Sequence, residues 1–85
     1  MTKEFLITFR SVTFAQRAER VLRRENVSCQ LQRTPKMLTS RGCGYCLRLR
    51  EKDALYAVAV LQGEQIQYGK LYAIKEDGTP QEQVL

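Results

Sequence analysis

The chain has 85 residues, with 14 Lys and Arg against 9 Asp and Glu and a formal net charge of +5. That length suffices for one small domain with a modest hydrophobic core. Because the sequence holds no His, it excludes a Ser-His-Asp triad, a Cys-His pair and imidazole metal ligands. Hydrophobic residues make up 44% of the chain and charged residues 27%, a balance typical of a globular protein rather than a disordered one.

The basic side chains are concentrated in the first part of the chain. Residues 1–52 hold 12 basic and 4 acidic residues, whereas residues 53–85 hold 2 and 5. Such asymmetry is typical of proteins with an anionic partner, although a solvated basic helix face gives the same pattern. No apolar run is long enough to span a membrane, and the charged N-terminus is unlike a signal peptide. Three cysteines without a secretion signal favour a reducing compartment, so we expect a cytoplasmic protein.

The first two predicted elements are a strand and a helix. Residues 5–9 alternate between apolar and more polar side chains, which predicts a strand. Thr13 and Gln16 have the spacing of a capping box, and the apolar residues that follow predict a helix over 14–25 that ends at Asn26. The outer face of this helix is basic, with Arg17, Arg20, Arg23 and Arg24.

The middle of the chain predicts two further strands and a second helix. Alternation predicts strands over 27–32 and 45–50, separated by a Pro- and Gly-containing loop over 35–44. Asp53 can cap a helix over 54–62, and Gly63 is expected to stop it. The apolar residues of this segment would also suit a buried strand, and the alanines favour the helix.

A last strand is predicted over 66–74. The order strand–helix–strand–strand–helix–strand predicts an α+β protein with the ferredoxin-like β-α-β-β-α-β plan, in which a four-stranded antiparallel sheet carries two helices on one face. We expect one domain over 1–76 and a flexible C-terminal tail over 77–85, because the tail is polar and contains Gly and Pro.

The motif that carries chemistry is Cys-Gly-Tyr-Cys at residues 43–46. A thiolate becomes reactive when nearby cations lower its pKa, and glycines leave the backbone open to a partner's sulfur. The candidate reactive thiolate is Cys43, and Cys46 is the candidate resolving thiol. The candidate supporting residues are Arg41, Gly42, Gly44 and Arg48.

Several chemistries compete for this motif. A zinc site needs four ligands and the chain offers only one further thiol, Cys29, so we predict no metal site and no cofactor. A thioredoxin-type dithiol lies at a helix N-terminus, whereas this pair precedes a predicted strand. A thiolate that carries a persulfide needs one exposed Cys on a loop, which suits Cys43. The motif could also be two small residues with no chemical role, and Cys29 is expected to be inert in the core.

Five features of the sequence occur together: the strand 5–9, the Ala18-Glu19 pair, the turn 34–36, the stretch 35–40 that leads to Cys43-Gly44, and Leu47-Arg48. Over roughly residues 4–76, this combination resembles the selenium/sulfur carrier-like family. Two features depart from the family pattern. The gap between Pro35 and Cys43 is about one residue longer, which can re-aim the thiol, and Cys46 adds a second thiol that could resolve a persulfide.

The resemblance implies a small carrier, not an enzyme, that holds sulfur or selenium on Cys43 as a persulfide or its selenium analogue. Its implied partners are a donor protein and an acceptor protein. The alternative is a thiol-redox or metal-responsive interaction module that uses Cys43 and Cys46. RNA binding through the arginine face is a third, weaker hypothesis, because strand 45–50 lacks paired stacking aromatics. The apolar helix 54–62 leaves a homodimer open.

Overall fold

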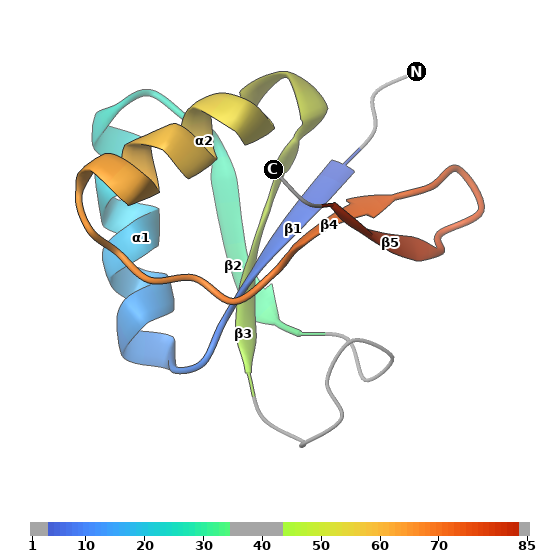
Figure 1. Ribbon diagram of the computed structural model, residues 1–85, viewed down its shortest axis with the longest axis horizontal. Coiled ribbons are helices and arrows are strands. Elements are labelled where there is room, and N and C mark those ends of the chain that lie inside the picture. Colours follow the sequence, from blue (N-terminus) through green and yellow to red (C-terminus); the bar gives the residue numbers. More distant parts are fainter. Residues whose placement is uncertain (1–3, 35–43, 84–85) are drawn as a thin grey trace.

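The computed structural model describes residues 4–34 and 44–83. Its elements in chain order are β1 (Glu4–Phe9), α1 (Val12–Arg24), β2 (Cys29–Arg33), β3 (Tyr45–Arg50), α2 (Glu51–Gly63), β4 (Leu71–Ile74) and β5 (Pro80–Gln83) (Figure 1). The strands form one sheet in the order β2-β3-β1-β4-β5, and every neighbouring pair is antiparallel. The α+β class, the antiparallel sheet and the two helices are therefore confirmed.

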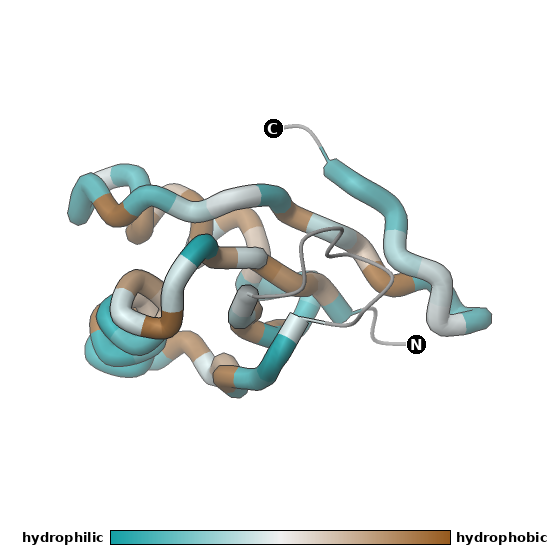
Figure 2. The backbone as a smooth tube through the Cα atoms, turned by 90° about the horizontal axis from the view of Figure 1, so that it is seen from below, coloured by the Kyte–Doolittle hydropathy of each residue, from teal (hydrophilic) through white to brown (hydrophobic). Residues whose placement is uncertain are grey.

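The predicted strand number of four is wrong, because β5 adds a fifth strand at the sheet edge. Its Gln83 lies opposite Leu71 and its Pro80 opposite Ile74. The turn before it is closed by a hydrogen bond from the Lys75 N–H to the Thr79 carbonyl, 2.9 Å long. β5 is hydrophilic along its length (Figure 2), so the apolar alternation on which strand prediction depends is missing. The domain boundary at residue 76 stays a prediction.

The hydrophobic core lies between the sheet and the two helices. Both helices pack against β1 and β3 and against each other (Figure 1), and they share one cluster of buried side chains with the sheet. The largest members of that cluster with no exposed surface are Ile7, Leu22, Leu47 and Leu61. Each such side chain stabilises the fold by about 2 kcal/mol through removal of apolar surface from water.

Within the described ranges, no helix is long and apolar enough to cross a membrane.

The start of α1 differs from the predicted one. The N-cap is Ser11, whose hydroxyl accepts a 3.3 Å hydrogen bond from the Phe14 N–H. The predicted cap, Thr13, lies inside the helix, because the chain turns out of β1 within two residues and reaches helical geometry earlier. The predicted end is confirmed: Asn26 has φ 63°, a left-handed conformation that Asn tolerates.

The bounds of α2 also differ from the prediction. Arg50, the last residue of β3, is the N-cap and makes no side-chain cap hydrogen bond. Asp53 therefore lies in the first turn, where its charge still complements the helix dipole. At the other end the helix includes Gly63, and the left-handed residue is Gln65, with φ 58°. The predicted last strand begins only at Leu71.

Candidate functional site

The Cys-Gly-Tyr-Cys motif lies where the chain enters β3. Cys43, Arg41 and Gly42 lie outside the described residues, so their predicted roles stay predictions. Gly44 is described, and its carbonyl accepts a 3.2 Å hydrogen bond from the Thr34 N–H. This bond extends the ladder between β2 and β3 by one residue pair. The residue that follows Cys43 is therefore fixed at the end of the sheet.

Gly44 sits in a tight position between Thr34 and the end of β1. A Cβ added to Gly44 would lie 3.3 Å from the Thr34 Oγ1 and 3.6 Å from the Phe9 carbonyl oxygen. The Thr34 Oγ1 is buried and has no hydrogen-bond partner among the residues the structure describes. From the sequence, Thr34 is placed only in the turn 34–36 and is given no role at the site, although its place directly before Pro35, at the start of the loop, is an available signal.

Cys46 lies on β3, opposite Thr8 of β1 and Gln32 of β2. It is on the face of the sheet away from the helices, yet its exposed fraction is 0%. Its Sγ lies 3.9 Å from the Arg33 carbonyl oxygen, the acceptor of a weak S–H hydrogen bond. Burial raises the pKa of the Cys46 thiol, although hydrogen bonding by Gln32 and the charge of Arg48 act in the opposite direction. The role of resolving thiol stays a prediction, and it requires that Sγ first be uncovered.

Arg48 is held by an ion pair across the sheet. Its Nε donates a 2.7 Å hydrogen bond to one carboxylate oxygen of Glu4, and its Nη2 donates to the other. The hydrogen bonds that Arg48 donates to this carboxylate raise the pKa of the guanidinium. Since the two groups are paired, much of the positive charge of Arg48 is neutralised by Glu4, and the remainder acts to lower the pKa of the Cys46 thiol. Its predicted supporting role stays a prediction.

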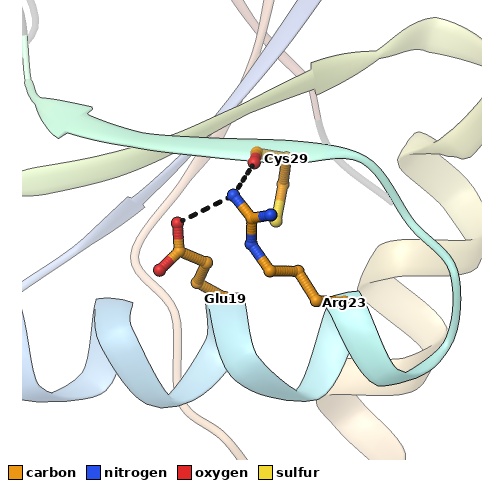
Figure 3. Close-up of polar contacts among 3 residues, drawn as sticks. All are labelled: Glu19, Arg23 and Cys29. Atoms are coloured by element: carbon orange, nitrogen blue, oxygen red, sulfur yellow. Dashed lines mark hydrogen bonds and ion pairs between the residues drawn. The ribbon is translucent and has the colours of Figure 1, made fainter.

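Cys29 begins β2 and faces the core, where it is 8% exposed. The neighbouring Arg23 binds the backbone of this residue: its Nη2 donates a 3.1 Å hydrogen bond to the Cys29 carbonyl and a 3.4 Å bond to the Glu19 carboxylate (Figure 3). Burial raises the pKa of the Cys29 thiol, and the charge of Arg23 lowers it only in part. The predicted burial of Cys29 in the core is confirmed.

Two of the three cysteines are thus buried as neutral thiols on opposite faces of the sheet. Alternate residues of a strand point to opposite faces: Cys29 pairs with core-facing Leu49, and Cys46 pairs with Gln32 on the other side. Within the described part of the chain, no three Cys, Asp or Glu side chains gather as metal ligands. Gly44, which follows the third cysteine in the sequence, lies at the fixed end of the β2–β3 ladder.

Comparison with known proteins gives one match. Residues 4–73 match the family model described as "Putative Se/S carrier protein-like". Searches of curated proteins and of solved structures find no significant match. The matched range runs from β1 into β4 and includes both ends of the β2–β3 loop, whereas β5 lies beyond it.

Proposed function

Because the chain belongs to the Se/S carrier protein-like family, we propose that it is a small carrier that holds a sulfur or selenium atom on Cys43. The atom is held as a persulfide, or as its selenium analogue. Its partners are a donor protein, which loads Cys43, and an acceptor protein, which removes the atom. The family assignment agrees with the resemblance expected from the sequence.

The burial of the two other cysteines carries this proposal. A carrier needs a thiolate that a partner's sulfur can reach, because the thiolate and not the thiol is the nucleophile. Cys29 is 8% exposed and Cys46 is 0% exposed, and burial raises the pKa of each thiol. The chain has three cysteines, so Cys43 is the one left for this chemistry.

The transfer step balances without an external oxidant. The Cys43 thiolate attacks the outer sulfur of the donor's persulfide, one S–S bond forms as the donor's S–S bond breaks, and the donor leaves as a thiolate that takes up a proton. The acceptor's thiolate then attacks the outer sulfur on Cys43 in the same way. The proposed supporting residues keep the roles predicted from the sequence: Arg41 and Arg48 provide positive charge, and Gly42 and Gly44 leave access to the backbone.

The buried position of Cys46 supports delivery to another protein rather than release within the chain. Attack of a Cys46 thiolate on a Cys43 persulfide would form an intramolecular disulfide and expel hydrogen sulfide. A protonated, covered Sγ makes that reaction slow, which lengthens the lifetime of the persulfide. Cys46 can act as a resolving thiol only after the end of β3 opens.

We also propose that the elements from β1 to β4 form a ferredoxin-like unit to which β5 is added. Without β5 the sheet order is β2-β3-β1-β4, and both helices contribute to the core on one face. These two features support the split β-α-β plan.

Loading by a persulfide donor tests the carrier function. We expect the protein, incubated with a cysteine desulfurase and cysteine, to gain about 32 Da, the mass of one sulfur atom, by intact mass spectrometry. Cys43→Ser should abolish the gain, and Cys46→Ala should keep it. A loss of about 2 Da in the wild type, which indicates a disulfide, would instead support a thiol-redox module. An adduct that survives in Cys43→Ser would contradict the assignment of Cys43.

A further inference from the structure

The end of the sheet that holds Gly44 also holds the start of α1. The Phe9 carbonyl oxygen lies 3.6 Å from the position that a Cβ on Gly44 would take. Only Arg10 and Ser11 separate Phe9 from α1, and Ser11 fixes the first turn by accepting a hydrogen bond from the Phe14 N–H. The first turn of α1 is therefore held near the residue that follows Cys43 (Figure 1).

Four side chains form an exposed surface at this end of the molecule, which we call the loop-end surface. Phe14 is 40% exposed, although it is a large aromatic residue in a small protein. Arg17 is exposed one turn further along α1, where residues three apart are neighbours on the helix surface. Arg10 is exposed just before α1, and Arg33 is exposed at the end of β2.

Arg33 belongs to the same surface because of the strand register and the direction of α1. Arg33 lies opposite Tyr45, which in turn lies opposite Phe9, and neighbouring strands are about 5 Å apart. The other end of β2, at Cys29, contacts Arg23 near the end of α1. The rise of β2 from Cys29 to its last residue, about 13 Å, corresponds to about nine helical residues. Arg33 is therefore level with the first turns of α1.

The loop-end surface is basic, and its arginines form no ion pair with any carboxylate that the structure describes. Arg23, Arg24 and Arg48 form ion pairs with carboxylates, whereas within the ranges 4–34 and 44–83 neither Arg10, Arg17 nor Arg33 does so. The first turn of α1 holds no acidic residue.

This charge pattern does not favour helix stability. A helix N-terminus is the positive end of the helix dipole, so acidic residues stabilise it and basic residues do not. An exposed aromatic side chain surrounded by arginines is instead the composition of a protein-binding hot spot. Unpaired positive charge around it would attract a negatively charged partner surface and raise the association rate.

We propose that the loop-end surface docks an acidic face of the protein that donates the persulfide, and so brings the donor's sulfur to Cys43. The inference rests on the proposed carrier function and identifies where its donor binds. A protein is favoured over a nucleic acid because Phe14 is the one strongly exposed ring at this end among the described residues, and single-stranded nucleic acid is bound by successive stacking rings. Docking positions the partners, and the transfer is the balanced exchange given above.

The test compares loading from a protein donor with loading from a small molecule. The rate of gain of about 32 Da is measured with a cysteine desulfurase plus cysteine, and separately with sodium tetrasulfide, which needs no docking. With the desulfurase, Phe14→Ala should load about tenfold more slowly than the wild type. Arg17→Glu should slow loading from the desulfurase by a similar factor at low salt, and this factor should become smaller as the salt concentration is raised. With tetrasulfide, Phe14→Ala should load at the wild-type rate.

Matched controls lie on α2, which starts at the opposite end of β3. Leu55→Ala removes an exposed apolar side chain, 69% exposed, and Lys52→Glu makes the same change of charge as Arg17→Glu. Both should load from the desulfurase at close to the wild-type rate. Arg17→Glu, at an exposed site, keeps the test valid if Phe14→Ala folds poorly.

Three outcomes would overturn the inference. If Phe14→Ala, Arg17→Glu and the α2 controls load from the desulfurase at equal rates, the loop-end surface is not the docking surface, and the carrier function is unaffected. Binding of a single-stranded RNA that depends on Phe14 and Arg17, with no effect on transfer, would replace the protein partner by a nucleic acid. Wild-type protein that gains no sulfur from either donor would overturn the carrier function itself, and the inference with it.

Discussion

At Gly69 the lack of a side chain allows a close contact between two segments beside the site. Its N–H donates a 2.6 Å hydrogen bond to the Thr8 carbonyl, and a Cβ there would lie 2.7 Å from the Thr8 Oγ1. Thr8 cannot easily turn away, because its hydroxyl accepts a 2.8 Å bond from the Lys70 N–H and donates to the Lys70 carbonyl. Since Thr8 lies opposite Cys46, this contact fixes β1 beside the buried thiol of β3.

Gly69→Ala should therefore destabilise the protein, by about 1–3 kcal/mol, the usual cost of forcing a methyl group into a filled space. The measurement is the free energy of unfolding in urea. Gly63→Ala is the control, because nothing lies within 4 Å of a Cβ at Gly63 in the last turn of α2. It should be neutral or stabilising by about 0.5–1 kcal/mol. Equal effects of the two variants would contradict the close contact.

The two buried cysteines show what a strand pattern can and cannot predict for the site. Cys29 shares its strand face with apolar residues, so its burial could be predicted from alternation. Cys46 shares its face with Arg48, and alternation places it on the polar side of the sheet. Its 0% exposure depends on tertiary contacts, which no local pattern encodes. Cys43 is already the candidate reactive thiol from the sequence, and what the structure adds is the burial of Cys46 that supports this proposal.

At the scale of elements, Arg23 ties the end of α1 to the outer strand of the sheet. Among the strands that the structure describes, β2 pairs only with β3, so one side of its backbone lacks a strand partner among them. The guanidinium of Arg23 donates to the Cys29 carbonyl and is positioned by Glu19 one turn earlier (Figure 3). Groups that occupy the backbone of an edge strand reduce its tendency to pair with another chain.

Replacement of this arginine tests the tie. Arg23→Met keeps the aliphatic part of the side chain and should lower the free energy of unfolding by about 0.5–1.5 kcal/mol, the net value of one hydrogen bond. Arg24→Met is the matched control on the next residue, whose ion pair with Glu64 is 4.0 Å long and exposed. An exposed pair of that length contributes about 0–1 kcal/mol. If Arg23→Met lowers the free energy of unfolding no more than Arg24→Met does, the hydrogen bond from Arg23 to the Cys29 carbonyl does not stabilise the fold.

The helices and the first three strands could be predicted because their apolar periodicity is strong, but several of their ends could not. Thr13 and Ser11 are both good caps, and the choice between them depends on the tightness of the turn after β1. Gln65 has no strong left-handed preference, and its φ of 58° is imposed by the chain returning to the core at buried Ile66. Such details are set by tertiary contacts rather than by local preference.

For the whole molecule, β5 completes the sheet on the side where the family match ends. It covers β4 with polar side chains, and Lys70 forms a 3.5 Å ion pair with Glu82 of β5. Leu71 of β4 is buried, and the three residues after it are partly buried. The fifth strand could not be predicted, because a polar strand depends on backbone pairing with a preformed neighbour and shows no apolar pattern.

A chain that ends at Gly78 should keep its fold and lose stability. Removal of 79–85 breaks a ladder of four residue pairs, whose hydrogen bonds contribute about 1 kcal/mol each at most. We expect a fall of about 1–3 kcal/mol in the free energy of unfolding, with the helical circular dichroism unchanged. The exposed edge of β4 should also make the chain associate as its concentration rises. Unchanged stability on truncation would mean that β5 adds nothing to the sheet.

The placement of Cys29 and Cys46 on opposite sides of the sheet has a practical consequence for handling the purified protein. Neither sulfur can bond to the other across the backbone layer, and neither is open to a neighbouring molecule. Air oxidation in storage should then yield a single covalent dimer, linked through one position, that a mild reductant converts back to monomer. A fluorophore maleimide should likewise attach at one place, without any cysteine being removed first.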